Sequence, residues 1–209
     1  MKKLQVALDL FSEKAALEVL SEVVEYVDVI ELGTPLVMIE DVGLIGRIKE
    51  KYPDKIVFAD IKIMDGGGVL SKIVFDAGAD MVSVLAAAED NTVRASIDCA
   101  REYGKLVLVD MCSVKNIEKR AKEIDEMAPD FVCVHVGYDI QSTGADPIED
   151  LHKINVIKTK TAIAGGINLS NFNEVVRSSA DLIIVGGGLC NQPNRADVAR
   201  EMRSIIEKN

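Results

Sequence analysis

Short runs of Val, Ile, Leu and Ala recur along this chain at intervals of roughly 25 residues, and each is followed by an amphipathic stretch. The runs lack the full polar alternation of a half-exposed sheet, which predicts parallel strands that are buried on both faces. We expect strands at residues 4–9, 27–32, 56–62, 80–85, 106–111, 131–136, 160–164 and 181–185. Apolar residues at helical spacing predict helices at residues 12–25, 38–51, 67–77, 91–103, 114–127, 148–154, 169–177 and 195–207.

Eight strand–helix units predict a closed (β/α)8 TIM barrel with parallel strands, in which residues 1–209 form a single domain. A doubly wound open sheet is the alternative, but no G-x-G-x-x-G motif follows the first strand. The sequence contains no linker and no low-complexity tract that would separate a second domain. Hydrophobic residues make up 48% of the chain and aromatic residues only 4%, so the core must be mainly aliphatic.

The formal net charge of −10 argues against a nucleic-acid-binding surface, which needs a basic patch. An anionic substrate would have to be bound by local features, since the overall field repels it. The cysteines lack the C-x-x-C spacing of a metal site and are expected to be reduced packing residues: Cys99, Cys112, Cys133 and Cys190. With no signal-peptide pattern and no apolar stretch near the roughly 20 residues of a membrane helix, we expect a cytoplasmic protein without a membrane partner.

Titratable side chains gather at the ends of several predicted strands. Asp9 ends the first strand, Glu31 the second, Asp60 and Lys62 the third, and His135 the sixth. Because active sites of TIM barrels lie at the C-terminal ends of the strands, we expect these side chains to line such a site. His135 is the candidate for acid–base work, although a lone histidine beside an apolar run can also be a hydrogen-bonded core residue.

The charged residues at these strand ends suggest a metal site. Asp60 and Lys62 are two apart on a strand and share a face, either as a self-satisfying ion pair or as working groups at the barrel mouth. Glu31 and Asp60 could supply two oxygen ligands to a hard ion such as Mg²⁺, although Glu31 could equally be a capping or solvated carboxylate. Asp9 could orient Lys62, bind substrate or merely begin a loop, and Asp110 is a similar but weaker candidate.

Two clusters of glycines follow the last two predicted strands, Gly165 and Gly166 after the seventh and Gly186 to Gly188 after the eighth. In TIM barrels these loops often bind a phosphate through backbone N–H groups, and glycine lets the phosphate oxygens come close. We expect the phosphate-binding residues to be Gly165, Gly166, Gly187 and Gly188. The longest irregular stretch, residues 137–147, is a candidate active-site loop.

A short motif places these candidates in a known family. Asp-x-Lys-x-x-Asp at the end of the third strand is formed here by Asp60, Lys62 and Asp65. With this motif, the chain resembles the orotidine-monophosphate-decarboxylase suprafamily over essentially its whole length. The matching segments lie at residues 4–9, 31–35, 59–65, 108–111, 135–139 and 185–188.

The segments that begin at Asp110 and His135 resemble the aldolase branch of this suprafamily. That resemblance implies a reversible aldol reaction of ribulose 5-phosphate with formaldehyde, which gives 3-hexulose 6-phosphate and uses Mg²⁺ or Mn²⁺. The alternative is the 3-keto-L-gulonate-6-phosphate decarboxylase branch, which carries Arg, Glu and Thr where this chain has Tyr138, Asp110 and Ala164. A non-catalytic barrel that senses sugar phosphates would not need a metal pair, a lysine and a histidine together.

The resemblance also implies roles for the strand-end residues in a reaction through an enediolate. Glu31 and Asp60 would hold the metal ion, and Lys62 would stabilise the charge that develops on oxygen. His135 would move the C1 proton or protonate the new alkoxide. Asp9 would keep Lys62 in place and charged.

The resemblance finally implies a homodimer in which Asp65 reaches into the active site of the neighbouring subunit and binds sugar hydroxyls. Asp65 lies past the end of its predicted strand, so it need not face its own barrel. The chain has Gly66 where the family usually has Ala, and we expect this difference to matter little.

Overall fold

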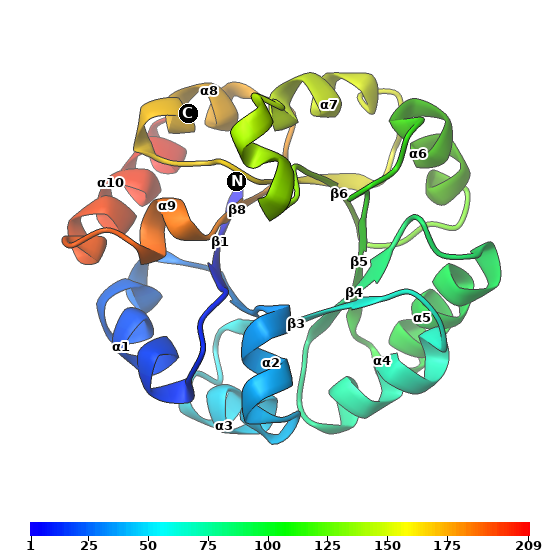
Figure 1. Ribbon diagram of the computed structural model, residues 1–209, viewed down its shortest axis with the longest axis horizontal. Coiled ribbons are helices and arrows are strands. Elements are labelled where there is room, and N and C mark those ends of the chain that lie inside the picture. Colours follow the sequence, from blue (N-terminus) through cyan, green and yellow to red (C-terminus); the bar gives the residue numbers. More distant parts are fainter.

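The computed structural model describes the backbone of residues 1–209 and every side chain except those of Ser142 and Thr143. Eight parallel strands close into a barrel in sequence order, and β8 pairs with β1 (Figure 1). The predicted (β/α)8 fold is therefore confirmed, and the open sheet is wrong. The strands are β1 (Lys3–Leu8), β2 (Val29–Leu32), β3 (Ile56–Ile63), β4 (Met81–Leu85), β5 (Leu106–Asp110), β6 (Phe131–His135), β7 (Lys160–Ala164) and β8 (Leu182–Val185).

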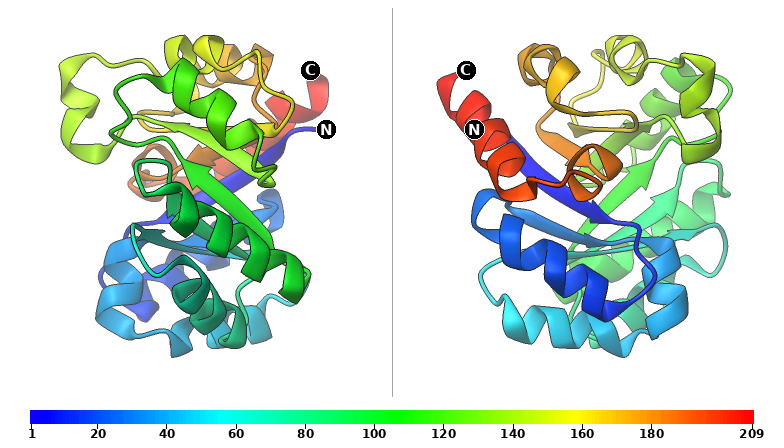
Figure 2. Two further views of the ribbon diagram at one scale, coloured as in Figure 1. Left: turned by 90° about the vertical axis from the view of Figure 1, so that its right-hand side faces the viewer. Right: turned by 60° about the vertical axis from the view of Figure 1, so that its left-hand side comes forward.

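Helices surround the barrel on all sides (Figures 1 and 2). None of the helices in the described part of the chain is long and apolar enough to cross a membrane. The four cysteines are free, as expected. The helices are α1 (Glu13–Val23), η1 (Val24–Tyr26), α2 (Thr34–Glu40), α3 (Gly43–Lys51), α4 (Gly67–Asp76), α5 (Asp90–Tyr103), α6 (Ile117–Asp125), η2 (Tyr138–Thr143), α7 (Pro147–Lys153), α8 (Leu169–Arg177), α9 (Gly187–Cys190) and α10 (Arg195–Lys208).

The single helix expected at residues 38–51 is instead two helices, α2 and α3. Pro35 stands in the first turn of α2, where its missing N–H costs nothing. The break comes at Asp41, whose φ of 76° ends α2. The Asp41 carboxylate then accepts a hydrogen bond from the backbone amide of Gly43 at 2.6 Å, which helps to start α3.

Apolar side chains form two cores, one inside the barrel and one between the strands and the helices. The inner core includes the buried side chains of Val29, Phe58, Met81, Leu108 and Leu182. Because these side chains fill the barrel, the interior is packed and is not a pore. Polar groups therefore collect where the strands end.

Four aspartates connect neighbouring strands by hydrogen bonds at the opposite end of the barrel, where the strands begin. Each directly precedes an even-numbered strand, and its carboxylate accepts a hydrogen bond from the second backbone amide of the preceding odd-numbered strand. The pairs are Asp28 with Leu4 (2.8 Å), Asp80 with Val57 (3.0 Å), Asp130 with Val107 (2.9 Å) and Asp181 with Thr161 (2.9 Å). The same aspartate contact thus repeats at every second pair of neighbouring strands.

Asp80 makes the most contacts of these four aspartates. Its carboxylate also forms ion pairs with Lys49 and Lys105, both at 2.8 Å. Burial alone would raise the pKa of Asp80, but the hydrogen bonds from Lys105, Lys49 and the Val57 amide lower it overall. Asp80 therefore links α3 to β3, β4 and β5.

Replacing Asp80 by Asn should lower the free energy of unfolding by about 1–2 kcal/mol at neutral pH, because two charge-assisted hydrogen bonds are lost. A carboxyl group with a lowered pKa contributes stability above its ordinary pKa and loses that contribution as the pH falls through the lowered value. The difference in urea midpoint between Asp80→Asn and the wild type should therefore shrink below about pH 4. Asp54→Asn, in an exposed loop, is the matched control. An equal loss at neutral and acid pH would contradict this account.

Candidate active site

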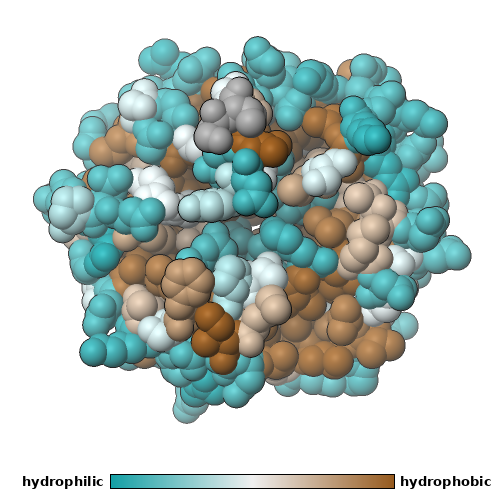
Figure 3. Space-filling view, in the orientation of Figure 1, coloured by the Kyte–Doolittle hydropathy of each residue, from teal (hydrophilic) through white to brown (hydrophobic). Residues whose placement is uncertain are grey.

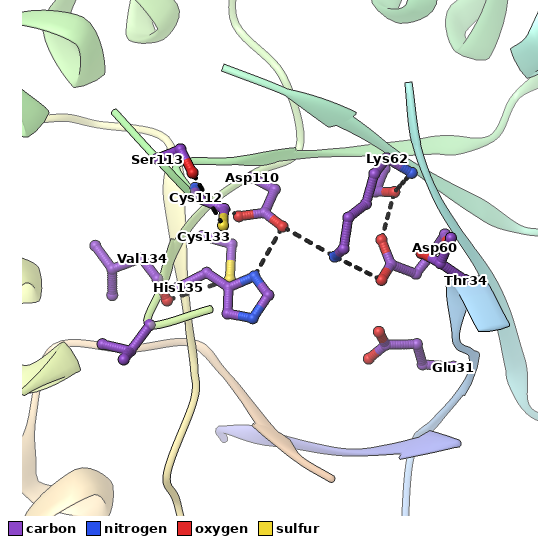
Figure 4. A network of polar contacts seen from close by, with 12 residues as sticks. Glu31, Thr34, Asp60, Lys62, Asp110, Cys112, Ser113, Cys133, Val134 and His135 are labelled. Carbon is purple, nitrogen blue, oxygen red and sulfur yellow. Dashed lines mark hydrogen bonds and ion pairs between the residues drawn. The ribbon is translucent and has the colours of Figure 1, made fainter. Parts of the chain in front are cut away.

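The central feature of the barrel mouth is the ammonium group of Lys62, which lies between two carboxylates (Figure 4). Lys62 Nζ is 2.8 Å from Asp60 Oδ2 and 3.4 Å from Asp110 Oδ2. Burial opposes the charge of Lys62, but the carboxylates of Asp60 and Asp110 raise its pKa well above the ordinary value. Lys62 is therefore a permanent cation at the mouth, held between β3 and β5.

The backbone of β3 is distorted to place this lysine. The pairing of β3 with β4 shifts register between Ala59 and Ile63, and Lys62 has a φ of 47°. The hydroxyl of Ser83 holds the distortion, because it accepts from the Lys62 amide at 2.9 Å and donates to Asp60 Oδ1 at 2.7 Å. This left-handed conformation is costly for a residue with a side chain, so β3 is kept in it by its neighbours.

His135 and Asp110 form the second part of the network. His135 Nδ1 is 2.8 Å from Asp110 Oδ2, and the Cys112 amide donates to Asp110 Oδ1 at 2.8 Å. Burial alone would raise the pKa of Asp110, but the hydrogen bond from His135, the charge of Lys62 and the Cys112 amide lower it. A carboxylate can only accept here, so Nδ1 carries the proton and Nε2 is left as the working nitrogen of His135.

Glu31 lies on β2 with its carboxylate pointing into the same space as Asp60, Lys62 and His135 (Figure 4). Its side chain is buried, and its Oε2 accepts a hydrogen bond from Gln5 Nε2 at 2.5 Å. Burial raises the pKa of Glu31 well above the ordinary value, and the nearby charge of Asp60 raises it further. The mouth therefore holds more buried carboxyl groups than Lys62 can pair with.

This excess of buried carboxylate fits a divalent cation. Glu31 and Asp60 offer oxygen donors, which hard ions such as Mg²⁺ prefer. Among the described side chains, no group of three or more His, Cys, Asp and Glu is close enough to form a metal cage. An ion held by Glu31 and Asp60 would thus have to complete its coordination with water or substrate oxygens, as Mg²⁺ commonly does.

Asp9 takes a different place from the one expected. Among the described residues, the ion-pair partners of Lys62 are Asp60 and Asp110, and Asp9 interacts with Lys62 only at longer range. Burial raises the pKa of Asp9, as does the negative charge of Asp60. The Asp9 carboxylate lies against Gly33, where an added Cβ would be 2.2 Å from Oδ1. Asp9 therefore belongs to the rim above β1 and β2, and the contact role falls to Asp60 and Asp110.

Asp65 is not brought into this network. Its side chain is exposed, and its Oδ1 accepts a hydrogen bond from the neighbouring Gly66 amide at 2.7 Å. Asp65 thus lies outside the mouth of its own barrel, beyond the end of β3.

The two glycine clusters meet at the ends of β7 and β8. Gly165 has a φ of 100°, and a Cβ there would lie 2.3 Å from the carbonyl oxygen of Val136. A Cβ on Gly188 would lie 2.0 Å from the carbonyl oxygen of Ile167. The loops after the two strands therefore pack so closely that only glycine fits, and the short helix α9 begins beside them at Gly187.

Comparison with known proteins gives the family. The sequence profile of the orotidine 5'-phosphate decarboxylase / HUMPS family matches residues 2–202. The chain belongs to this family. It is 45% identical over 206 residues to 3-hexulose-6-phosphate synthase of Bacillus subtilis, with 98% of each chain covered. It is 40% identical over 207 residues to the synthase of Staphylococcus epidermidis, with 98% of this chain and 99% of that one covered.

Solved structures of proteins with the same two names, synthase and decarboxylase, are also similar to this chain. The crystal structure of 3-hexulose-6-phosphate synthase from Salmonella typhimurium matches with a TM-score of 0.96 and 39% identity, covering 99% of each chain. The 3-keto-L-gulonate-6-phosphate decarboxylase from Vibrio cholerae matches with a TM-score of 0.87 and 27% identity, covering 99% of this chain and 98% of that one. The decarboxylase branch is thus similar in fold but more distant in sequence.

From the sequence, one residue of this site was ranked too low and two others were not identified. Asp110 was a weak candidate, yet it contacts both Lys62 and His135. The signal was available, because β5 and β6 are neighbours in a barrel and both end on titratable groups. Ser83 and Gln5 were not identified, since a polar residue inside an apolar run gives no sign of its partner.

Proposed function

We propose that this protein catalyses the reversible, metal-dependent aldol condensation of D-ribulose 5-phosphate with formaldehyde to D-arabino-hex-3-ulose 6-phosphate. The observation that carries the proposal is the array of Lys62, Asp110 and His135 in a chain that matches synthases named for this reaction over 98% of its length. The array offers a fixed positive charge next to a histidine, as expected for a reaction through an enediolate.

The proposed metal is Mg²⁺ or Mn²⁺, held by Glu31 and Asp60. Such an ion, when bound, would act as a Lewis acid toward the carbonyl and hydroxyl oxygens of the sugar phosphate. The buried carboxyl pair supports this assignment, because burial and the charge of Asp60 raise the pKa of Glu31, and a cation beside it would favour the ionised form.

The side chains of the mouth would carry out the proton transfers and stabilise the developing charge. His135 Nε2 would take the proton from C1, and the electron pair left on C1 would form the new bond to the carbon of formaldehyde. The formaldehyde oxygen would then receive a proton, for which His135 is also the candidate. The Lys62 ammonium would stabilise the negative charge that develops on oxygen, and Asp110 would fix both Lys62 and His135.

The phosphate of the substrate would bind at the loops after β7 and β8. The first hydrogen bonds of α9 come from the amides of Leu189 and Cys190, so the earlier amides of Gly187 and Gly188 are not used by the helix itself. Together with Gly165 and Gly166, they would bind phosphate oxygens without a basic side chain. Binding energy at this distance from C1 would orient the sugar for reaction.

We also propose that the protein works as a homodimer in which Asp65 completes the site of its neighbour. Large apolar side chains are exposed around Asp65, namely Met64 and, on α4, Val69, Leu70 and Ile73. Figure 3 shows this apolar surface at the lower right, where Figure 1 places α4. A patch of this kind on a protein surface marks an interaction site, and a second copy would bring its own Asp65 with it.

The direct test is consumption of formaldehyde with ribulose 5-phosphate and Mg²⁺. We expect formaldehyde loss that requires the sugar phosphate and stops on addition of EDTA, because the metal would stabilise the developing charge. 3-Keto-L-gulonate 6-phosphate is the parallel substrate. Release of CO₂ from it without formaldehyde loss would move the chain to the decarboxylase branch, and no turnover of either would contradict the enzyme assignment.

Replacing Asp110 by Asn should lower kcat by about 100-fold or more. The amide removes the negative charge that holds Lys62 and can offer an N–H to His135, which would favour the wrong tautomer of the imidazole. The measurement is kcat and KM for ribulose 5-phosphate, together with circular dichroism to establish folding. Asp54→Asn is the matched control for loss of one carboxylate, and near wild-type kcat in Asp110→Asn would remove Asp110 from the mechanism.

The role of Asp65 can be tested by mixing two inactive variants, Asp65→Ala and Lys62→Ala. A hybrid dimer would contain one site with its own Lys62 and the intact Asp65 of the other subunit. Random mixing makes half of the dimers hybrids with one intact site, so about a quarter of wild-type activity should return. Hybrids formed by co-expression with two affinity tags and still inactive would show that Asp65 does not act across the interface.

A further inference from the structure

Gln5 is a polar residue buried in the apolar interior of the barrel, below the active site. Its side chain has no exposed surface, and its neighbours in register are Val29 on β2 and Ile184 on β8. Both of these side chains belong to the inner apolar core. An aliphatic residue would fill such a position without the cost of burying an amide.

Only one of the two polar atoms of the Gln5 amide has a hydrogen-bond partner. Gln5 Nε2 donates to Glu31 Oε2 at 2.5 Å, but Gln5 Oε1 has no hydrogen-bond partner among the described groups. An unsatisfied buried oxygen costs about 1–3 kcal/mol. The chain therefore bears a cost at this position in order to place one N–H beside Glu31.

The amide faces Glu31 with its nitrogen, which is the orientation that a metal-binding, ionised carboxylate requires because it only accepts hydrogen bonds. Within the part of the chain whose side chains are described, Gln5 is the only hydrogen-bond partner of the Glu31 carboxylate. Gln5 stands on β1 two residues before Ala7, which is the register partner of Glu31, so the two side chains come from adjacent strands of the rigid barrel. Among the described side chains, the hydrogen bond from Gln5 is therefore the contact that sets the direction of the Glu31 carboxylate.

We infer that Gln5 is a positioning residue that fixes the Glu31 carboxylate for a divalent cation at the barrel mouth. The hydrogen bond occupies Oε2 from below and leaves Oε1 as the oxygen directed toward the cation. Gln5 does not touch substrate in this role and acts only through Glu31, as outer partners of metal ligands generally do. The inference rests on the proposed function, since it takes Glu31 to be a ligand of the ion.

The test uses the full-length protein and Mn²⁺ alone, with free Mn²⁺ measured by electron paramagnetic resonance. In Gln5→Leu, which keeps the bulk and removes the donor, the Kd for Mn²⁺ should rise by about 10-fold or more. Binding of inorganic phosphate at the glycine loops should stay within about twofold, and saturating Mn²⁺ should recover most of kcat. A merely structural role for Gln5 would lower the urea midpoint in EDTA and leave the Kd for Mn²⁺ unchanged.

Thr161→Val is the matched control, because Thr161 is also a buried polar residue of a strand and bonds elsewhere, to the carbonyl of Ser179. Its Kd for Mn²⁺ should equal that of the wild type. Gln5→Asn is the second variant, in which the amide is kept but withdrawn by one methylene, and it should weaken Mn²⁺ binding as Gln5→Leu does.

The outcomes separate the inference from the proposed function. Tight Mn²⁺ binding and turnover by the wild type, with an unchanged Kd in both Gln5 variants, would overturn the role of Gln5 alone. A wild type that binds no Mn²⁺ would remove both. Failure of both variants to fold would make Gln5 a structural residue and overturn the positioning role.

Discussion

The rest of the site depends on one balance of charge, a single ammonium group among several carboxylates. Lys62 contacts Asp60 and Asp110 directly, and these contacts keep it charged. Two further carboxylates, of Glu31 and Asp9, have raised pKa values because burial and the charge of Asp60 both oppose their ionisation. One ammonium group cannot pair with four carboxyl groups, and among the described side chains Glu31 and Asp9 have no ion-pair partner. In the proposed function, a divalent ion beside Glu31 and Asp60 would supply the missing positive charge.

The barrel makes this arrangement possible because the contacts that stabilise the fold lie away from the mouth. Its interior is filled with aliphatic and aromatic side chains, and its opposite end is fastened by aspartates such as Asp80 that bond the amides of neighbouring strands. Asp110 and His135 end adjacent strands, so their 2.8 Å contact is set by two rigid elements and not by a flexible loop. A site built in this way holds its geometry before any substrate arrives.

The sequence predicted the barrel well, because period and length distinguish buried parallel strands from amphipathic helices along the whole chain. The break between α2 and α3 at Asp41 was not predicted, because the hydrophobic pattern does not reveal a residue with a positive φ. Strand ends likewise predicted that Glu31, Asp60, Lys62 and His135 would converge. Which group contacts which depends on the register and distortion of the strands. Lys62 pairs with Asp60, which shares its predicted face, but also with Asp110, where Asp9 had been expected. A pattern along the chain can therefore name the members of a site more readily than their contacts.

The distortion of β3 shows why such contacts are hard to read from sequence. Two residues of a regular strand that are two apart point to one face, but Lys62 reaches Asp60 from a backbone with a φ of 47°. That conformation is unfavourable for lysine by itself, and it persists because Ser83 bonds both its amide and Asp60. The site is thus stabilised by its surroundings against the preferences of its own residues. Lys62 and the half-satisfied Gln5 both bear such a local cost, as residues of a functional site often do.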